Sequence, residues 1–469
     1  MTDHSPENPI LAAWQDILAR FGQAPAIFSP TGTVLRSFAQ IALEALKIGR
    51  LFEHIPPHSV VAVQIGNSEL WPELVLALWR HKLIPMPLGE MGQTELAYTL
   101  GTCRAAALVT NLGGPLIVHR RPVAGDATRW PELVPEFLKL TSGTTSAPRT
   151  VRFRASQLYA DCENICTTMG LTDLDTNYGV IPFSHSYGFS NLITPLLVRG
   201  VRLVVSHDRM PRAILDGLED TKATVFPATP VFFQKLAELS NPPELPSLRR
   251  CISAGAPLTK QAAGMFSANF GVKIHTFYGS SECGGICYDA SEERNYEDGF
   301  VGTPLHGVEI EHGAEEAGPI RVRSAAVGDG YFPEEDRETL AGGRFVPADL
   351  VQRGERGLYL VGRTSEVINV AGRKLNPLEI EARLAEFPGV RQAVVFGVES
   401  ALRGEEPVAC IAGDDLGREA ILRFCHEKLS PWQVPRDVWL VGEIPTNDRG
   451  KISRRGLAES YRARRPNLS

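Results

Sequence analysis

The sequence predicts an α/β protein, with a large N-terminal domain of mainly parallel sheets and flanking helices followed by a small α+β C-terminal domain. At 469 residues the chain exceeds the usual size of a single hydrophobic core. Strand-like and helix-like segments alternate through much of residues 60–349, which is the pattern of parallel strands joined by helices. The pattern changes near Asp349, and we place the boundary at Thr364, which gives domains 1–363 and 364–469.

The first elements follow from hydrophobic spacing. Ile10, Trp14 and Ile17 recur at helical intervals and predict an amphipathic helix over residues 10–21. An apolar run over residues 60–65 predicts a strand. Asn67-Ser68 then predicts the cap of a helix around residues 74–79.

The strand and helix order is clearest between residues 249 and 279. Cys251-Ile252 predicts a strand, residues 261–270 predict a helix, and residues 272–277 predict the next strand. Such a repeat predicts parallel neighbours in one sheet.

The C-terminal part has a compact α+β pattern. Gly362-Arg363 predicts a break after a strand at residues 358–361, and Asn376-Pro377 predicts a capped helix start. The remaining predicted elements are strands at 367–370, 391–398 and 438–441 and a helix at 418–429.

Composition excludes several classes. Lys and Arg number 48 against 54 Asp and Glu, and the net charge of -6 argues against a nucleic-acid partner. No apolar run reaches the ~18 residues of a membrane span. Residues 1–9 are polar and do not resemble an export signal, and eight cysteines are too few for a disulfide scaffold in so long a chain. We therefore expect a soluble, cytoplasmic protein without a membrane span.

One loop is rich in hydrogen-bond donors. Thr141-Ser142-Gly143-Thr144-Thr145 is followed by Ser146, Pro148 and Arg149. Backbone N–H groups and hydroxyls in such a turn can wrap phosphate oxygens, although the spacing is not that of a Walker A loop. Taken alone, an ordinary Ser/Thr-rich surface loop explains the composition equally well.

Further motifs accompany this loop, and together they resemble the ATP-dependent adenylate-forming superfamily. That family includes acyl- and aryl-CoA synthetases, peptide-synthetase adenylation domains and luciferases. The resemblance covers nearly the whole chain. The matching motifs, in the family's order, are Thr141 to Arg149, Pro182-Phe183-Ser184-His185-Ser186-Tyr187-Gly188, Ser253-Ala254-Gly255-Ala256-Pro257-Leu258, Tyr278-Gly279-Ser280-Ser281-Glu282, Gly318 to Tyr331, Asp349-Leu350, Gly362 to Gly372, and Asn447-Asp448-Arg449-Gly450-Lys451.

The resemblance implies ATP and Mg²⁺ as cofactors and assigns roles to residues. Glu282 holds Mg²⁺, which favours carboxylate oxygen and bound phosphates. Asp349 accepts both ribose hydroxyls, Arg363 supports the ribose or a phosphate, and Tyr278 stacks on the adenine. Lys451 stabilises the adenylation transition state as a flexible point charge. The residues implied to bind ATP or the acceptor are Thr141, Ser142, Gly143, Thr144, Thr145, Arg149, Gly255, Ala256, Tyr278, Gly279, Ser281, Asp349, Arg363, Gly372 and Lys374.

His185 bears on the acid substrate. A lone histidine is more often structural, but its Pro-x-x-His-x-x-Gly context resembles the acyl- and aryl-CoA ligases, in which this position gates the acid pocket. Amino-acid-activating relatives usually place an Asp here. Ser184-His185 therefore argues against an α-amino acid. We predict catalytic roles for His185, Glu282 and Lys451.

The resemblance also implies a second half-reaction. The C-terminal domain swings about a hinge aligned with Ser365, withdraws Lys451 and brings up the 370–374 loop for a pantetheine thiol. Gly372 allows close backbone approach, and Lys374 meets a phosphate of CoA or an acidic carrier protein. The acceptor is thus CoA or the phosphopantetheine of a separate acyl carrier protein.

Two loop positions depart from the family, since Ser146 replaces a glycine and Arg149 a lysine. Arg149 keeps the charge, and we expect activity to survive. The leading hypothesis is an acid–thiol ligase for an aryl or fatty acyl substrate, acting as a monomer or homodimer. The alternatives are an amino-acid adenylation domain, a β-lactone-forming ligase and a catalytically silent nucleotide-binding homologue.

Overall fold

The chain forms two compact units, which are described separately. The first comprises Met1–Glu311, Arg321–Pro347 and Arg356–Leu358, and the second comprises His312–Ile320, Ala348–Glu355 and Tyr359–Ser469. The computed structural model describes residues 8–111, 114–122, 130, 133–141, 149–312, 317–363, 366–371, 373–400, 403–445 and 452–464.

The largest sheet run of the first unit has a parallel centre. Its strand order is β15-β14-β13-β12-β11-β9-β10-β1-β2, and every neighbouring pair from β13 to β1 is parallel. Antiparallel strands flank the centre on both sides. The strands are β1 (Pro25–Phe28), β2 (Val34–Ser37), β9 (Thr176–Gly179), β10 (Arg202–Val205), β11 (Val225–Ala228), β12 (Arg250–Ser253), β13 (Ile274–Ser280), β14 (Gly284–Tyr288) and β15 (Phe300–Pro304).

Two smaller sheets complete this unit. One has the order β4-β3-β5-β6, and the other has the order β18-β8-β7. Their strands, with the short β19 and β20, are β3 (Val60–Gln64), β4 (Ile84–Pro87), β5 (Ala105–Thr110), β6 (Ile117–Arg120), β7 (Phe137–Leu140), β8 (Thr150–Phe153), β18 (Gly330–Phe332), β19 (Leu340–Ala341) and β20 (Arg344–Phe345).

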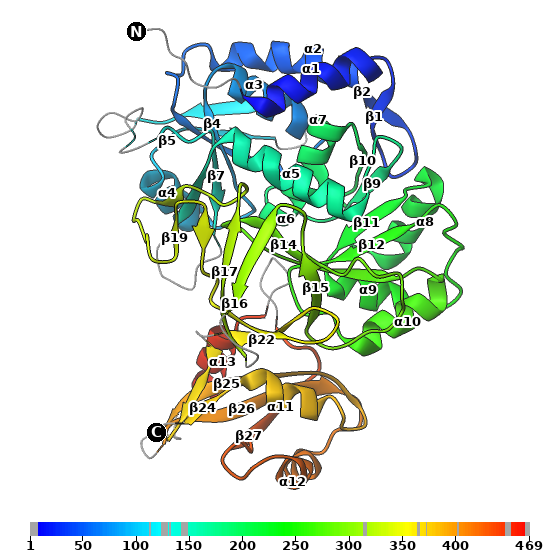
Figure 1. The fold of residues 1–469 in the computed structure, drawn as a ribbon, viewed down its shortest axis with the longest axis vertical. Helices are drawn as coiled ribbons and strands as arrows, with labels where there is room; N and C mark the ends of the chain where they lie inside the picture. The colour runs from blue at the N-terminus through cyan, green and yellow to red at the C-terminus, as the bar shows by residue number, and fades with distance from the viewer. Residues whose placement is uncertain are drawn as a thin grey trace. The chain divides into compact units, whose positions relative to one another are not determined.

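Helices cover these sheets, and Figure 1 shows α8, α9 and α10 beside β11 and β12. The predicted first helix is present, and it buries Ile10, Trp14 and Ile17 while Asn8 caps its start. The helices are α1 (Pro9–Phe21), α2 (Phe38–Gly49), η1 (Arg50–Phe52), α3 (Trp71–Arg80), α4 (Gln93–Thr102), α5 (Ala155–Met169), α6 (Ser186–Gly188), the π-helical η2 (Phe189–Ile193), α7 (Thr194–Arg199), α8 (Pro211–Thr221), α9 (Pro230–Ala237) and α10 (Lys260–Phe270).

The second unit contains a mixed sheet with both faces covered. Its order is β24-β23-β26-β25, with β27 parallel to β26. One face packs against α11 and α12 and the other against α13. The elements are β23 (Ile368–Val370), β24 (Arg373–Leu375), α11 (Pro377–Leu384), β25 (Val390–Ser400), β26 (Gly404–Gly413), α12 (Arg418–Lys428), β27 (Asp437–Val441) and α13 (Arg454–Arg464).

Four further strands lie where the chain passes between the units. They are β16 (Val308–His312), β17 (Gly318–Ser324), β21 (Asp349–Arg353) and β22 (Leu358–Arg363). The predicted break at Gly362-Arg363 is wrong, because both residues belong to β22.

The predicted fold class is confirmed, namely a large α/β part with a parallel centre and a smaller α+β part. The predicted cap at Asn67-Ser68 is wrong in detail, because α3 begins at Trp71 with Leu70 at its N-cap. Ser68 instead accepts a hydrogen bond from the Leu70 amide and supports the turn before the helix. No helix among the described residues has the length and apolar character needed to cross a membrane.

Candidate active site

Three of the predicted site segments follow parallel strands. Because β9, β11, β12 and β13 are parallel neighbours, their carboxyl ends meet at one edge of the sheet. The segment after β9 carries His185, the segment after β12 carries Gly255 and Ala256, and the segment after β13 carries Glu282. Open α/β sheets bind their ligands at this edge. The fold therefore brings together residues that are far apart in sequence.

The segment bearing His185 is tied to the sheet by an asparagine. Asn67 Oδ1 accepts a hydrogen bond from the Phe183 amide at 2.9 Å, and its Nδ2 donates to the Ile181 carbonyl at 3.1 Å. His185, half-buried, directly precedes α6. At Gly188 a Cβ would lie 2.1 Å from the Pro182 carbonyl oxygen, so only glycine fits this turn.

The aromatic residue beside His185 connects this segment to the central strands. Tyr187 donates its hydroxyl hydrogen bond to the Ile252 carbonyl at 2.8 Å, and its ring centroid lies 5.9 Å from that of Phe277. Burial raises the pKa of the Tyr187 hydroxyl well above its usual value. Tyr187 is therefore a neutral donor at neutral pH.

The turn after β12 is open to solvent. Gly255 and Ala256 are exposed, and Gly255 has a φ of +87°, a left-handed conformation that favours glycine. The turn is therefore accessible from solvent, and the predicted binding role of Gly255 and Ala256 stays a prediction.

The β13–β14 hairpin carries the next group of predicted residues. Tyr278 is 7% exposed. A Cβ at Gly279 would lie 2.7 Å from the Gly284 carbonyl oxygen, which explains the glycine. Ser281 Oγ accepts a hydrogen bond from Ser186 Oγ at 3.0 Å and so joins the hairpin to α6.

Glu282 and Arg149 lie on either side of a third residue, Tyr331. The Tyr331 hydroxyl donates to Glu282 Oε1 at 3.2 Å, and Ser280 Oγ donates to Glu282 Oε2. The Arg149 guanidinium lies over the Tyr331 ring, 3.5 Å from its centroid. Burial, together with the negative charge of Glu282, raises the pKa of Tyr331, so the hydroxyl remains a donor.

The ends of the hydroxyl-rich loop are held together. Strands β7 and β8 pair antiparallel, and the Thr141 amide and Oγ1 both donate to the Arg149 carbonyl at 2.9 Å. Ser142, Gly143, Thr144 and Thr145 lie outside the described residues, so their phosphate contacts stay predictions.

The remaining predicted residues belong to the second unit. Arg363 Nε donates to Asp349 Oδ1 at 2.7 Å, which places one nitrogen donor on the carboxylate expected to bind the ribose. Lys374 lies on β24, which forms a tight hairpin with β23. Gly372 and Lys451 lie outside the described residues.

Two residues escaped the sequence reasoning. Asn67 was interpreted as a helix cap, although its partners lie more than 100 residues away. Tyr331 closed a motif without receiving a role. The position of Tyr331 within that motif was a signal from which a site role could have been predicted. No residue near Asn67 in the sequence indicates which groups it binds.

The oxygen donors around Glu282 suit a hard cation. The carboxylate and Ser280 Oγ are the kind of ligand that Mg²⁺ takes alongside substrate phosphates. Among the described residues there is no group of three or more His, Cys, Asp or Glu side chains that could hold a metal ion by itself. The oxygen atoms of Glu282 and Ser280 fit Mg²⁺ as partial ligands.

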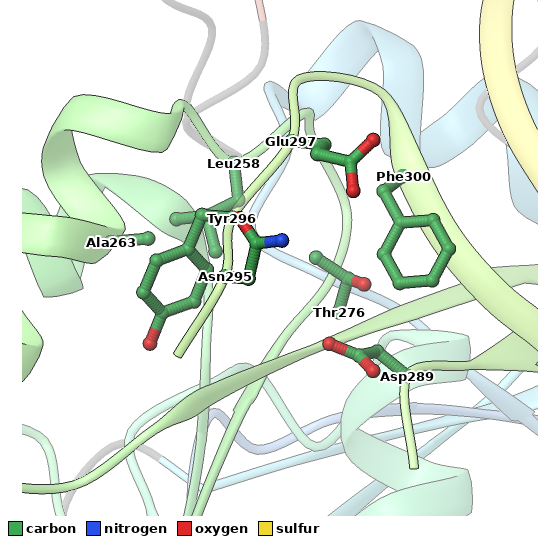
Figure 2. Close-up of a pocket in the computed structure, with 8 residues that line it drawn as sticks. All are labelled: Leu258, Ala263, Thr276, Asp289, Asn295, Tyr296, Glu297 and Phe300. Carbon is green, nitrogen blue, oxygen red and sulfur yellow. The ribbon is translucent and has the colours of Figure 1, made fainter. Parts of the chain in front are cut away.

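A small cavity elsewhere in the first unit is not part of this site. Figure 2 shows the residues that line it, and its volume of about 10 Å³ accommodates a single water molecule. None of them is a predicted site residue. They are Leu258, Ala263, Thr276, Asp289, Asn295, Tyr296, Glu297 and Phe300.

Comparison with solved structures identifies the class of fold. The ATP-bound MatB crystal structure from Rhodopseudomonas palustris matches with a TM-score of 0.83, covering 96% of this chain and 98% of MatB. The two sequences are 22% identical, so this likeness shows the fold alone. The two proteins therefore share one fold over nearly their whole lengths.

The sequence also matches the models of a protein family. Residues 14–332 match the AMP-binding enzyme model, and residues 379–451 match the AMP-binding enzyme C-terminal domain. The chain belongs to the AMP-binding enzyme family. The predicted membership of the adenylate-forming superfamily, and with it the prediction of an AMP-forming ligase, is confirmed.

Two relatives illustrate the family members that this chain resembles. A Humulus lupulus protein named "Probable CoA ligase CCL9" is 29% identical over 458 residues, covering 86% of this chain and 87% of the relative. A 3,4-dihydroxybenzoate–[aryl-carrier protein] ligase of Bacillus anthracis is 26% identical over 325 residues, covering 69% of this chain and 73% of the relative.

Proposed function

We propose that the protein is an acid–thiol ligase that activates a non-amino carboxylic acid, aryl or fatty acyl, and transfers it to a pantetheine thiol. The observation that carries this proposal is the arrangement of Arg149, Tyr331 and Glu282 beside the root of the hydroxyl-rich loop. This arrangement supports the proposal because it sets a cation and a carboxylate beside the loop that we propose to hold the triphosphate.

In the first step the acid carboxylate oxygen attacks the α-phosphorus of ATP. An oxygen–phosphorus bond forms, the bond to the β-phosphate bridging oxygen breaks, and pyrophosphate leaves. Two anions have to approach each other, so charge neutralisation and alignment dominate the catalysis. In our proposal residues 141–149 hold the phosphates, Tyr278 holds the adenine, and Lys451 contacts the reacting oxygens.

Mg²⁺, when bound with ATP, neutralises phosphate charge. Glu282 would hold it, because its carboxylate is fixed by donors from Ser280 and Tyr331. The Tyr331 hydroxyl orients one carboxylate oxygen and leaves that oxygen's remaining lone pair available.

In the second step the thiol sulfur attacks the acyl carbon of the acyl-adenylate. A thioester forms, AMP leaves with the bond to the acyl carbon broken, and the thiol proton passes to solvent. We propose that residues 364–469 move as a lid for this step and present Gly372 and Lys374 to the pantetheine arm, while residues 1–363 form the platform. The β23–β24 pairing supports this, because Val370 lies opposite Arg373 and Ala371, between them, is exposed.

The acid is proposed to lie beside His185. Ser184-His185 supplies no carboxylate to grip an α-amino group, which argues against an amino-acid adenylation domain. The relatives use both kinds of thiol, since one is named as a CoA ligase and the other as an aryl-carrier protein ligase. CoA and a separate carrier protein are therefore both proposed acceptors.

We also propose a reducing, cytoplasmic location. All eight cysteines of the chain are buried free thiols. Secreted proteins usually pair their cysteines.

Product analysis tests the proposal. The protein is incubated with Mg·ATP, an acid from a panel of aryl, aliphatic and β-hydroxy acids, and either CoA or a phosphopantetheinylated carrier protein. The products are identified by mass spectrometry. The proposal predicts AMP and a thioester. AMP with a β-lactone and no thioester would establish the ring-closing alternative, and the absence of any acid-dependent AMP would favour the silent homologue.

A further inference from the structure

A buried ion pair lies behind the turn that carries Glu282. Lys139, on β7, and Asp161, on α5, have side chains that are each 3% exposed, and Lys139 Nζ lies 3.9 Å from Asp161 Oδ2. Burial lowers the pKa of Lys139, while the charges of Asp161 and Glu282 act in the opposite direction. Buried charges are unfavourable unless they are paired and hydrogen-bonded, so the pair calls for an explanation.

Hydrogen bonds join this pair to two further elements. Ser190 Oγ donates to Asp161 Oδ2 at 2.6 Å and accepts from Lys139 Nζ at 3.3 Å. The Gly285 amide donates to Asp161 Oδ1 at 2.9 Å. Ser190 lies in η2, and π-helical turns of this kind frequently accompany functional sites.

The contact with the hairpin leaves no spare room. Gly284 has a φ of +72°, and a Cβ there would lie 2.0 Å from Asp161 Oδ1. The Asp161 carboxylate therefore lies directly against the backbone two residues after Glu282. Lys139 in turn stands two residues before Thr141, where the hydroxyl-rich loop is anchored.

We infer that Lys139 and Asp161 are positioning residues that hold the Glu282 turn and the root of the 141–149 loop in register for magnesium–nucleotide binding. The inference rests on the proposed role of Glu282. Asp161 fixes the Gly284–Gly285 backbone, and Lys139 with Ser190 fixes Asp161. Small displacements of a binding group strongly reduce its contribution to binding and catalysis. The need to fix the Glu282 turn therefore explains why the chain keeps a buried ion pair here.

The same unit contains a matched control. Lys273 and Asp289 form a second buried pair with side chains 3% and 6% exposed and 2.7 Å between Nζ and Oδ2. Ser291 contributes its hydroxyl to this pair, donating to Asp289 Oδ1 and accepting from Lys273 Nζ. This pair flanks the opposite end of the β13–β14 hairpin. It is therefore also a buried Lys–Asp pair bridged by a serine hydroxyl, but it lies away from Glu282.

The experiment compares Lys139→Met/Asp161→Asn with Lys273→Met/Asp289→Asn. ATP affinity is measured by calorimetry across a MgCl₂ series without any acid, and thermal unfolding is recorded in parallel. We expect the Lys139/Asp161 variant to weaken Mg·ATP binding about tenfold, as for loss of a positioned contact to a charged group. The Lys273/Asp289 variant should keep the wild-type Mg·ATP affinity, even if its melting temperature falls as much as that of the Lys139/Asp161 variant.

Ser190→Ala is measured as well, because it keeps both charges and preserves the fold if the double variant fails to form. It should weaken Mg·ATP binding several-fold. Wild-type affinity in Ser190→Ala or in a folded Lys139/Asp161 variant would overturn the inference, as would equal losses in the two double variants. A wild type that binds Mg·ATP but activates no acid would contradict the proposed function while leaving the positioning role standing.

Discussion

Arg149 illustrates how a single residue departs from its family and still has a defined place. The resemblance leads to lysine at this position, and the structure shows a guanidinium 3.5 Å from the centroid of the Tyr331 ring. The planar, weakly hydrated guanidinium stacks on aromatic faces more readily than an ammonium group. Arg149 therefore contributes a cation whose position is set by Tyr331.

The Tyr331 hydroxyl provides the first test at this scale. Tyr331→Phe keeps the ring under Arg149 and removes the donor to Glu282. Because hydrogen bonds to charged groups contribute about 1.5–3 kcal/mol, we expect the half-saturating Mg²⁺ concentration of the adenylation reaction to rise about tenfold or more. The measurement is a Mg²⁺ titration of that reaction.

Tyr288→Phe is the matched control. Tyr288 is also buried, and among the described residues its hydroxyl has no hydrogen-bond partner. Its removal should leave the Mg²⁺ titration unchanged. An unchanged titration in Tyr331→Phe as well would remove the hydroxyl from the account of Glu282.

The sequence predicted Glu282 and Arg149 because each stands within a contiguous motif. It did not predict the Lys139–Asp161 pair, nor that Tyr331 connects Glu282 to Arg149. Those contacts join residues that are between 22 and 182 positions apart, and local sequence patterns do not predict contacts over such separations.

At the scale of elements, the segment between β9 and α6 depends on an anchor outside it. Asn67 holds the backbone of residues 181–183 through both ends of its amide. Asn67→Ala should loosen the segment that carries His185 and raise the KM for the acid about tenfold, with a smaller change in the KM for ATP. Steady-state kinetics with each substrate varied in turn measure this difference.

Asn269→Ala serves as its control. Asn269 on α10 likewise donates a side-chain hydrogen bond to a backbone carbonyl, that of Ala237, at 2.7 Å. We expect it to leave both KM values unchanged. Equal increases in the two KM values in Asn67→Ala would indicate general destabilisation of the protein, not a local loosening of the segment that carries His185.

Helix α3 contains a carboxyl whose titration depends on burial. Glu73 is fully buried, its Oε1 lies 2.7 Å from Arg36 Nε, and burial outweighs this pairing and raises its pKa from 4.5 to about 7. Between those values the folded chain keeps a proton that the unfolded chain has lost. Stability therefore falls as pH rises through this range, by up to about 3 kcal/mol.

Glu73→Gln should remove that dependence. Urea unfolding of both proteins at about pH 5 and about pH 8 measures it, and the wild type should lose more stability between the two than the variant. Subtracting the loss in the variant from the loss in the wild type removes the contributions of all other titrating groups. Identical losses would show that Glu73 is ionised throughout the range.

The sequence predicted the existence and type of these elements better than their ends. Residues 261–270 became α10 within one residue, because the helix has a clear period and the Thr259 side chain caps it. Gly362-Arg363 was interpreted as a break from composition alone, although strand pairing continues β22 through both residues. Asn67 resembled a cap, yet tertiary hydrogen bonds engaged its amide instead.

At the scale of the whole molecule, the C-terminal domain carries the residues predicted to distinguish the two half-reactions. We propose that Lys451 serves adenylation and that the thiol enters beside Gly372, both in the C-terminal domain. Lys451→Ala should abolish adenylation while leaving thioester formation from supplied acyl-adenylate largely intact. The two half-reactions are measured separately, by isotope exchange and by thioester formation.

Lys428→Ala is a suitable control, because Lys428 ends α12 and no site role is assigned to it. It should affect neither half-reaction. Equal losses of both half-reactions in Lys451→Ala would contradict the proposed movement of the C-terminal domain.

The central claim is that the chain activates a carboxylic acid as its adenylate. Acid-dependent ATP–pyrophosphate exchange, measured across a panel of aryl, aliphatic and amino acids, tests it most directly. The account predicts Mg²⁺-dependent exchange with at least one non-amino acid and its loss in Glu282→Ala. Protein that binds ATP but supports exchange with no acid, or with α-amino acids alone, would contradict it.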